Sequence, residues 1–282
     1  MSDPLDWWEA VVLGVVEGIT EFLPVSSTGH LTFAEKLLGH QIDAADVTAF
    51  TAIVQIGAIL AAVIYFRNDL WRIVVALLRG AGHRERRTGA DWRLAVAVVV
   101  GSIPIGIAGL VFKDQIETTL RDLWVVGAAL IAWSGVMHYA DTRGSLERYE
   151  ESVSTRDTLI IGLVQCLALI PGVSRSGATM SAGLLLGIDR VTVTRFSFFL
   201  AIPALAAATA LEAVSEFDNI AEGVGWGPTI AATVVSFFVA YVVIAWLLRY
   251  VAQHTFRLFI VYRVVLGVAI LALLASGAIS ST

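Results

Sequence analysis

Six long apolar runs dominate this chain and leave few folds open to it. Each is long enough, or nearly so, to cross about 30 Å of hydrocarbon as a helix, which takes roughly 17 to 25 residues. Hydrophobic residues make up 57% of the 282 residues and charged residues only 15%, a composition typical of membrane proteins. The sequence therefore predicts an all-α polytopic membrane protein with one integral membrane domain over 1–282. The spans are expected near 50–66, 94–112, 123–140, 196–211, 229–248 and 258–276.

Lysine and arginine are distributed unevenly between the segments that join these runs. Seven arginines lie between the first two runs, and seven more lie in three later segments. Because positively charged loops stay in the cytoplasm, the expected cytoplasmic segments are 67–93, 141–157, 188–195 and 249–257. The expected extracytoplasmic segments are 39–49, 113–122, 215–228 and the C-terminus. No basic segment precedes the first apolar stretch, so no cleaved signal peptide is expected.

Two further apolar segments, 7–38 and 157–187, are each interrupted by proline and a cluster of serine and glycine. Their arms of roughly 11 to 16 residues suit re-entrant helical hairpins, which enter the membrane and return on the same side. The stretch "VSSTG" from Val25 lies over "VSRSG" from Val173 at an offset of 148 residues. Because three spans follow each hairpin, the second half must be upside down, which predicts an inverted-topology repeat. The two repeats are expected near 7–140 and 157–276.

The first hairpin carries two carboxylates, Glu17 and Glu21. Their spacing of four residues puts both on one face of a helix. An ionised acid at membrane depth costs roughly 2.5 to 3.5 kcal/mol, and no lysine or arginine lies in this arm. A compensating cation is therefore expected, which is a divalent metal, a proton or Arg175. The alternative is a shallow hairpin whose acids reach water.

Helix-capping residues follow the acids. Pro24 is expected to end the first arm, and Ser26 or Ser27 then caps the second arm. The free N–H groups and the dipole of that helix N-terminus form a potential anion site. His30 lies three residues after Ser27, on the same face. An ordinary helix cap beside a buried, hydrogen-bonded histidine is an equally open interpretation.

The second hairpin repeats the cap and adds a charge. Within "PGVSRSGAT", residues 171–179, Arg175 is the one charged residue of the stretch 158–188. Its planar guanidinium suits bidentate contact with phosphate. A structural salt bridge to Glu17 or Glu21 is the alternative, and the two roles can coexist. Hydroxyls, an arginine, carboxylates and a histidine together are a combination that phosphoryl transfer can use.

The stretches "EGITEFLPVSSTGH", residues 17–30, and "PGVSRSGAT" resemble the two signature motifs of the bacitracin-resistance family of undecaprenyl-diphosphate phosphatases. The similarity in span layout covers essentially the whole chain. The resemblance implies a metal-dependent hydrolase of the bacterial plasma membrane, with its active site on the extracytoplasmic side. It would convert undecaprenyl diphosphate to the monophosphate that carries cell-wall precursors, using a divalent cation such as Mg²⁺ or Ca²⁺. The isoprenoid diphosphate and the bilayer are the expected partners, nucleic acid is not, and a homodimer stays open.

The resemblance also implies a role for each matching residue. Glu17 and Glu21 would bind the metal and the diphosphate, and Ser27 would be the nucleophile. His30 would act as acid or base, and Arg175 would clamp the phosphate during catalysis. Further phosphate contacts are expected from Ser26, Thr28, Ser174, Arg175, Ser176 and Thr179. Gln165, the repeat partner of Glu17, is uncharged, so the two hairpins are not expected to be equivalent.

An isoprenoid lipid-phosphate transporter or flippase is the alternative function, because inverted repeats with broken helices are typical of secondary transporters. The acid pair together with Ser27 and His30 favours the enzyme, since a carrier needs only cationic contacts to bind phosphate. Type-2 phosphatidic acid phosphatases do not fit. The chain has no Arg-Pro pair, and Ser181 stands where their second histidine would be.

Arg263 lies inside the last apolar run and no motif explains it. Either its side chain extends to the cytoplasmic surface, or it pairs with an acid that the sequence does not identify.

Overall fold

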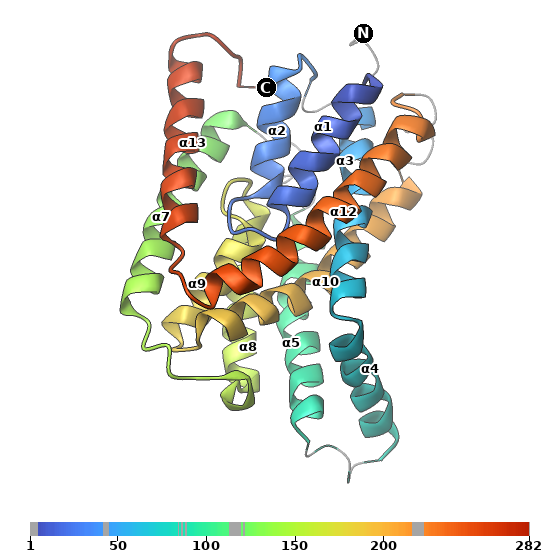
Figure 1. Ribbon diagram of the computed structural model, residues 1–282, viewed down its shortest axis with the longest axis vertical. Coiled ribbons are helices and arrows are strands. Elements are labelled where there is room, and N and C mark those ends of the chain that lie inside the picture. The colour runs from blue at the N-terminus through green and yellow to red at the C-terminus, as the bar shows by residue number, and fades with distance from the viewer. Residues whose placement is uncertain are drawn as a thin grey trace.

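The computed structural model is an all-helical bundle (Figure 1) that describes residues 5–41, 45–83, 85, 87, 89–112, 120, 122–215 and 223–281. Among these residues, six helices are long and apolar enough to cross a membrane. They are α3 (Ala45–Tyr65), α5 (Ala90–Val111), α7 (Leu123–Arg143), α10 (Arg190–Ser215), α12 (Trp226–Val251) and α13 (Arg257–Ala275). The six predicted spans are confirmed as helices of suitable length and composition.

Two segments expected to join spans are partly helical. The segment after the first span forms α4 (Arg67–Gly82), which continues from α3 after Phe66. Its continuous apolar run, 73–78, has only six residues, too few to mark a membrane span in the sequence. The segment 188–195 contains the start of α10, because the Asp189 side chain accepts hydrogen bonds from the N–H groups of Val191 and Thr192 and so caps a helix that begins six residues early.

Four short helices form two pairs. In the first, α1 (Trp7–Thr20) packs against α2 (Ser27–Leu37), and in the second, α8 (Thr155–Gln165) packs against α9 (Arg175–Leu185), with η4 (Cys166–Leu169) following α8. Helices of 14 and 11 residues are too short to cross about 30 Å. α1 ends at Thr20, four residues before Pro24, which has no N–H to donate to the Thr20 carbonyl.

In each pair, the first helix crosses one of the long helices closely at a glycine. A Cβ atom on Gly14 of α1 would lie 2.5 Å from the carbonyl oxygen of Ala232 in α12. A Cβ atom on Gly162 of α8 would lie 2.3 Å from the carbonyl oxygen of Gly101 in α5. Both distances are shorter than real Cβ contacts, so only glycine allows these backbones to approach. Gly14 and Gly162 are separated by the same 148 residues as the two serine motifs.

Both expectations for Arg263 are wrong. Its side chain in α13 is 0% exposed and therefore does not extend to a surface. In the described chain, its hydrogen-bond acceptors are backbone carbonyls and the hydroxyl of Ser134, with no carboxylate among them. The carbonyl oxygens of Pro24, Leu130 and Gly172, which come from different parts of the sequence, take the place of an acid.

Two arginine–aspartate ion pairs link segments at the end of the bundle where α8 and α10 begin. Arg148 Nη2 lies 2.6 Å from Asp157 Oδ2, and Arg190 Nε lies 2.6 Å from Asp141 Oδ1. Burial opposes the charged form of Asp157, but the hydrogen bonds from Arg148 and Ser154 outweigh it and lower the pKa of Asp157 to about 2. At the other end, the N–H of Leu123 donates to the carbonyl of Ser281 at 3.0 Å, which joins the C-terminal segment to the start of α7 (Figure 1).

Candidate functional site

The turns of the two short helix pairs meet inside the bundle. The N–H of Gly172 donates to Ser26 Oγ at 3.0 Å, and Ser176 Oγ donates to the carbonyl of Leu23 at 2.8 Å. Residues about half a chain apart are therefore hydrogen-bonded to each other. The two serine motifs therefore lie together in the structure.

The second helix of each pair begins with the same cap. Ser26 Oγ accepts from the N–H of Gly29 at 3.3 Å, and Ser174 Oγ accepts from the N–H of Gly177 at 3.1 Å. Both serines have positive φ, 77° and 76°, which is uncommon for residues other than glycine. Of the two candidate caps in the first motif, Ser26 is the one used. Ser27 and Arg175 are consequently the first residues of α2 and α9, in equivalent positions.

Glu21 is the centre of the polar contacts between the two turns. Ser27 Oγ donates to Glu21 Oε2 at 2.5 Å, and Gln55 Nε2 donates to the same oxygen at 3.4 Å. Arg175 Nη2 donates to Glu21 Oε1 at 3.2 Å, with side chains that are 10% and 3% exposed. The salt bridge considered for Arg175 therefore exists, and its partner is Glu21. The guanidinium also donates to the carbonyl of Ser197 at 3.2 Å, which fixes its orientation.

Glu17 lies one turn earlier on α1 and is 1% exposed. Both of its carboxylate oxygens are buried without a hydrogen-bond partner in the described structure, although the group interacts electrostatically with Glu21 and Arg175. Buried polar atoms without partners are costly, so these oxygens suit a ligand. No cluster of three or more His, Cys, Asp or Glu side chains able to hold a metal occurs in the part of the chain that is described. One or two carboxylates, completed by substrate phosphate oxygens, are nevertheless a common Mg²⁺ site.

His30 is hydrogen-bonded at both ring nitrogens. Its Nδ1 lies 2.7 Å from the carbonyl oxygen of Ser26, and its Nε2 lies 2.7 Å from the hydroxyl of Tyr262 in α13. A carbonyl oxygen only accepts, so Nδ1 carries a hydrogen, and Nε2 of the neutral ring accepts from Tyr262. The hydrogen-bond partner of Ser27 is thus Glu21 and not His30, although both lie on the face predicted from spacing.

The other predicted phosphate contacts divide into two groups. Ser26, Ser174, Ser176 and Thr179 are buried, and their hydroxyls already bond within and between the turns, as Ser174 Oγ does with Ser176 Oγ at 3.0 Å. The second group is Thr28 alone, which is exposed near the start of α2. Ser26 and Ser176 therefore hold the two turns together. Ser174 caps α9, and Thr179 links α9 to Ser197 of α10. Contact with phosphate stays a prediction for both groups.

Four residues of this region carry no signature in the two motifs. Thr209 Oγ1 donates to Gln55 Oε1 at 3.1 Å, which turns the amide nitrogen of Gln55 toward Glu21. Tyr262 and Arg263 reach the two turns from α13. The signal that could have identified them is a polar side chain inside an otherwise apolar run, since such residues in a membrane usually face a functional interior.

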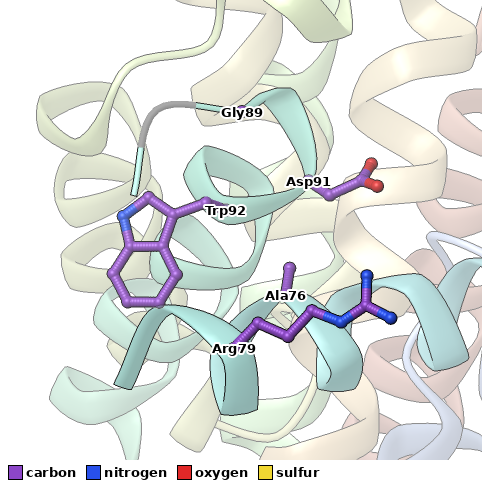
Figure 2. A pocket seen from close by; sticks show the side chains of 5 residues that line it. All are labelled: Ala76, Arg79, Gly89, Asp91 and Trp92. Atoms are coloured by element: carbon purple, nitrogen blue, oxygen red, sulfur yellow. The ribbon is translucent and has the colours of Figure 1, made fainter. Parts of the chain in front are cut away.

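A surface hollow of about 510 Å³ lies elsewhere, between α4 and the start of α5 (Figure 2). Its lining consists of Ala76, Arg79, Gly89, Asp91 and Trp92. None of the predicted site residues contributes to it, so it is separate from the centre at the two turns.

Ionisable side chains buried among six apolar helices are characteristic of polytopic membrane proteins with a functional polar interior, a class that includes membrane enzymes and transporters. Within that class, the chain belongs to the bacitracin resistance protein BacA family, whose sequence profile matches residues 10–269. It is 63% identical over 274 residues to undecaprenyl-diphosphatase 3 of Frankia casuarinae, which covers 97% of this chain and 99% of the relative. The undecaprenyl-diphosphatase of Cutibacterium acnes is 54% identical, with 98% and 100% covered. Undecaprenyl-diphosphatase 1 of Streptomyces avermitilis is 50% identical, with 96% and 98% covered. The family resemblance of the two motifs is confirmed.

Proposed function

We propose that this protein removes the terminal phosphate of undecaprenyl diphosphate, releasing undecaprenyl phosphate and inorganic phosphate, and so recycles the lipid carrier of cell-wall precursors. The names of the relatives and their near-complete coverage support this activity. The observation that carries the proposal structurally is the 2.5 Å hydrogen bond from Ser27 Oγ to Glu21 Oε2. A hydroxyl bonded to a carboxylate that a third group orients is the arrangement of an activated nucleophile, which a lipid-phosphate carrier would not need.

In the proposed reaction, Ser27 Oγ attacks the terminal phosphorus and its proton passes to Glu21 Oε2. The bond from that phosphorus to the bridging oxygen breaks, and undecaprenyl phosphate leaves. Water then cleaves the phosphoserine, which releases inorganic phosphate and restores the hydroxyl. In the variant with direct attack by water, Glu21 takes the proton of the water and Ser27 orients it. The hydrogen bond supports Glu21 as the base for Ser27. His30 and Tyr262 are then proposed to interact with the bridging oxygen that leaves with undecaprenyl phosphate.

Arg175 and the starts of α2 and α9 are proposed to bind the diphosphate. The first N–H groups of a helix and its dipole favour an anion, and two such helix starts lie at the meeting turns. Arg175 is held by Glu21 and the Ser197 carbonyl, so its cation is already in place before substrate arrives. Preorganised charge of this kind lowers the barrier for phosphoryl transfer because it needs no rearrangement during the reaction.

Glu17 and Glu21 are proposed to hold a divalent cation, Mg²⁺ or Ca²⁺. When bound, such an ion supplies positive charge to the phosphate oxygens. The unpartnered buried oxygens of Glu17 support this assignment. Glu21 already accepts hydrogen bonds at both oxygens, so Glu17 is the more available ligand of the two.

The fold is proposed to be an inverted repeat with two re-entrant hairpins, α1–α2 and α8–α9. Three observations support it, namely the equivalent caps at Ser26 and Ser174, the equivalent glycine crossings, and the length of the four short helices. The distribution of arginine supports a plasma-membrane orientation with the active site and the C-terminus extracytoplasmic.

The test is phosphate release from undecaprenyl diphosphate by detergent-purified protein at increasing Mg²⁺ or Ca²⁺. Release that rises with metal concentration is expected. A detergent micelle has no second compartment, so a protein that only transports the lipid would release no phosphate. Absence of release at every metal concentration would overturn the proposed function.

A further inference from the structure

Arg263 is a buried cation that the proposed chemistry does not use. It is the largest fully buried side chain among the described residues, at 0% exposed. Burying a charge without a counter-charge is unfavourable unless hydrogen bonds compensate fully. A fold that keeps an arginine in this position is expected to gain something specific from it.

The guanidinium bonds to both turns of the site at once. Nη1 donates to the carbonyl of Pro24 at 3.1 Å, and Nη2 donates to the carbonyl of Gly172 at 2.8 Å. Pro24 and Gly172 are separated by 148 residues, the offset that also relates Ser26 to Ser174. Each carbonyl therefore lies two residues before a helix cap, and one planar group recognises the same position of both turns.

The other side of the guanidinium is fixed to α7. Its Nε donates to Ser134 Oγ at 3.2 Å, and Nη2 also approaches the carbonyl of Leu130 at 3.4 Å. Ser134 Oγ in turn donates to the Leu130 carbonyl at 2.7 Å, so the hydroxyl has its own hydrogen committed and presents a lone pair to Arg263. The cation is thereby held in one orientation between α7 and α13.

The two turns carry different halves of the proposed chemistry. Ser27 lies three residues after Pro24, and Arg175 lies three residues after Gly172. From these contacts we propose that Arg263 is a positioning residue, which ties the turn of Ser27 to the turn of Arg175 at a fixed separation. The inference rests on the proposed function, because it assigns Arg263 a role in that reaction without contact with substrate.

The kinetic test compares Arg263→Met with Arg257→Met, which removes an exposed arginine at the start of the same helix. Misplacing the hydroxyl relative to the phosphate clamp should lower kcat by about 10- to 100-fold, with KM changed by less than about threefold. Arg263→Lys, which keeps the charge and can still donate to a carbonyl, should recover part of kcat. An unchanged kcat, or a raised KM with normal kcat, in folded Arg263→Met protein would overturn the inference.

Ser134→Ala is a milder variant in case Arg263 itself is needed for folding. It removes one fixed point of the guanidinium but keeps its charge, and kcat should fall by about threefold or more at unchanged KM. Ser102→Ala is the matched control, because Ser102 Oγ also donates to the carbonyl four residues earlier. Among the described residues, no arginine donates a hydrogen bond to Ser102. Equal kcat in the two folded variants would contradict the role of Arg263.

Amide hydrogen exchange gives a readout that does not depend on activity. In Arg263→Met or Ser134→Ala, exchange should rise in peptides covering both turns, 21–30 and 170–178, and stay unchanged in the rest of the protein. A rise throughout the chain, or in neither turn, would refute the positioning role. If wild-type protein released no phosphate while both turns still loosened together, the proposed function would fail and the link between the turns would stand.

Discussion

The pair of Arg175 and Glu21 gives the account a quantitative prediction about stability. The two side chains are 10% and 3% exposed and their charged atoms lie 3.2 Å apart. In metal-free protein, replacing Arg175 with Met leaves the Glu21 carboxylate buried without a cation. Removing one partner of a buried ion pair costs about 3 to 5 kcal/mol, so Arg175→Met should lower the free energy of unfolding by that amount.

The double variant separates this cost from the loss of packing. In Arg175→Met with Glu21→Gln, both partners are neutral, and the Gln side chain can still accept from Ser27. The double variant should therefore be more stable than Arg175→Met alone, with a coupling free energy of about 1 to 3 kcal/mol between the two sites. Both variants should lose phosphatase activity, because the clamp on the phosphate is absent from each.

Unfolding in mixed micelles, followed by SDS titration and circular dichroism, measures these differences. Arg257→Met is the control, since its exposed side chain should change the free energy of unfolding by less than about 0.5 kcal/mol. Arg175→Met protein as stable as wild type would refute the reasoning. So would a double variant whose destabilisation equals the sum of the two single changes, because the charges would then not depend on each other.

Three further predictions concern packing, pH and metal. Gly14→Ala should destabilise the protein by about 1 to 3 kcal/mol in thermal melts, since its Cβ would lie 2.5 Å from the backbone oxygen of Ala232. The control is Gly135→Ala, whose Cβ would meet nothing within 4 Å and which should be neutral. Equal melting temperatures of the two variants would contradict the close crossing at Gly14. The pKa of Asp157 is lowered to about 2, so the stability that its carboxylate contributes is present above the unfolded pKa and is lost as pH falls. Asp157→Asn should therefore lose less stability than wild type between about pH 4 and pH 2. Parallel curves of unfolding free energy against pH for the two proteins would exclude the effect. Chelation should abolish phosphate release until Mg²⁺ or Ca²⁺ is restored, and Glu17→Gln should raise the metal concentration needed; activity that persists after chelation would rule out the metal.

The spans and short helices were predictable because the length of an apolar run and the position of a proline within it can be seen in consecutive residues. The offset of 148 also predicted that the two motifs adopt equivalent caps, which Ser26 and Ser174 do. The parts that were missed depend on periodicity or on single caps. α4 is amphipathic and its apolar run, 73–78, is too short to indicate a span. α10 begins early because Asp189 caps it.

Within the site, the sequence predicted which residues gather but not how they pair. Spacing placed Ser27 and His30 on one face, and it could not indicate that His30 would be engaged by Tyr262, 232 residues away. The same limit applies to Arg263, whose partners Pro24 and Gly172 come from the two distant turns. Pairing of this kind is set by how α13 lies beside α7 and close to the two turns, and no local pattern carries that information.

The central claim is that the Ser27 hydroxyl, bonded to Glu21, is the group that reacts with the terminal phosphate. The most direct test is kcat for phosphate release from undecaprenyl diphosphate by purified, folded Ser27→Ala protein at saturating metal, beside Ser102→Ala. The account predicts a loss of about a thousandfold or more for Ser27→Ala and wild-type turnover for Ser102→Ala. Appreciable turnover by Ser27→Ala would contradict it.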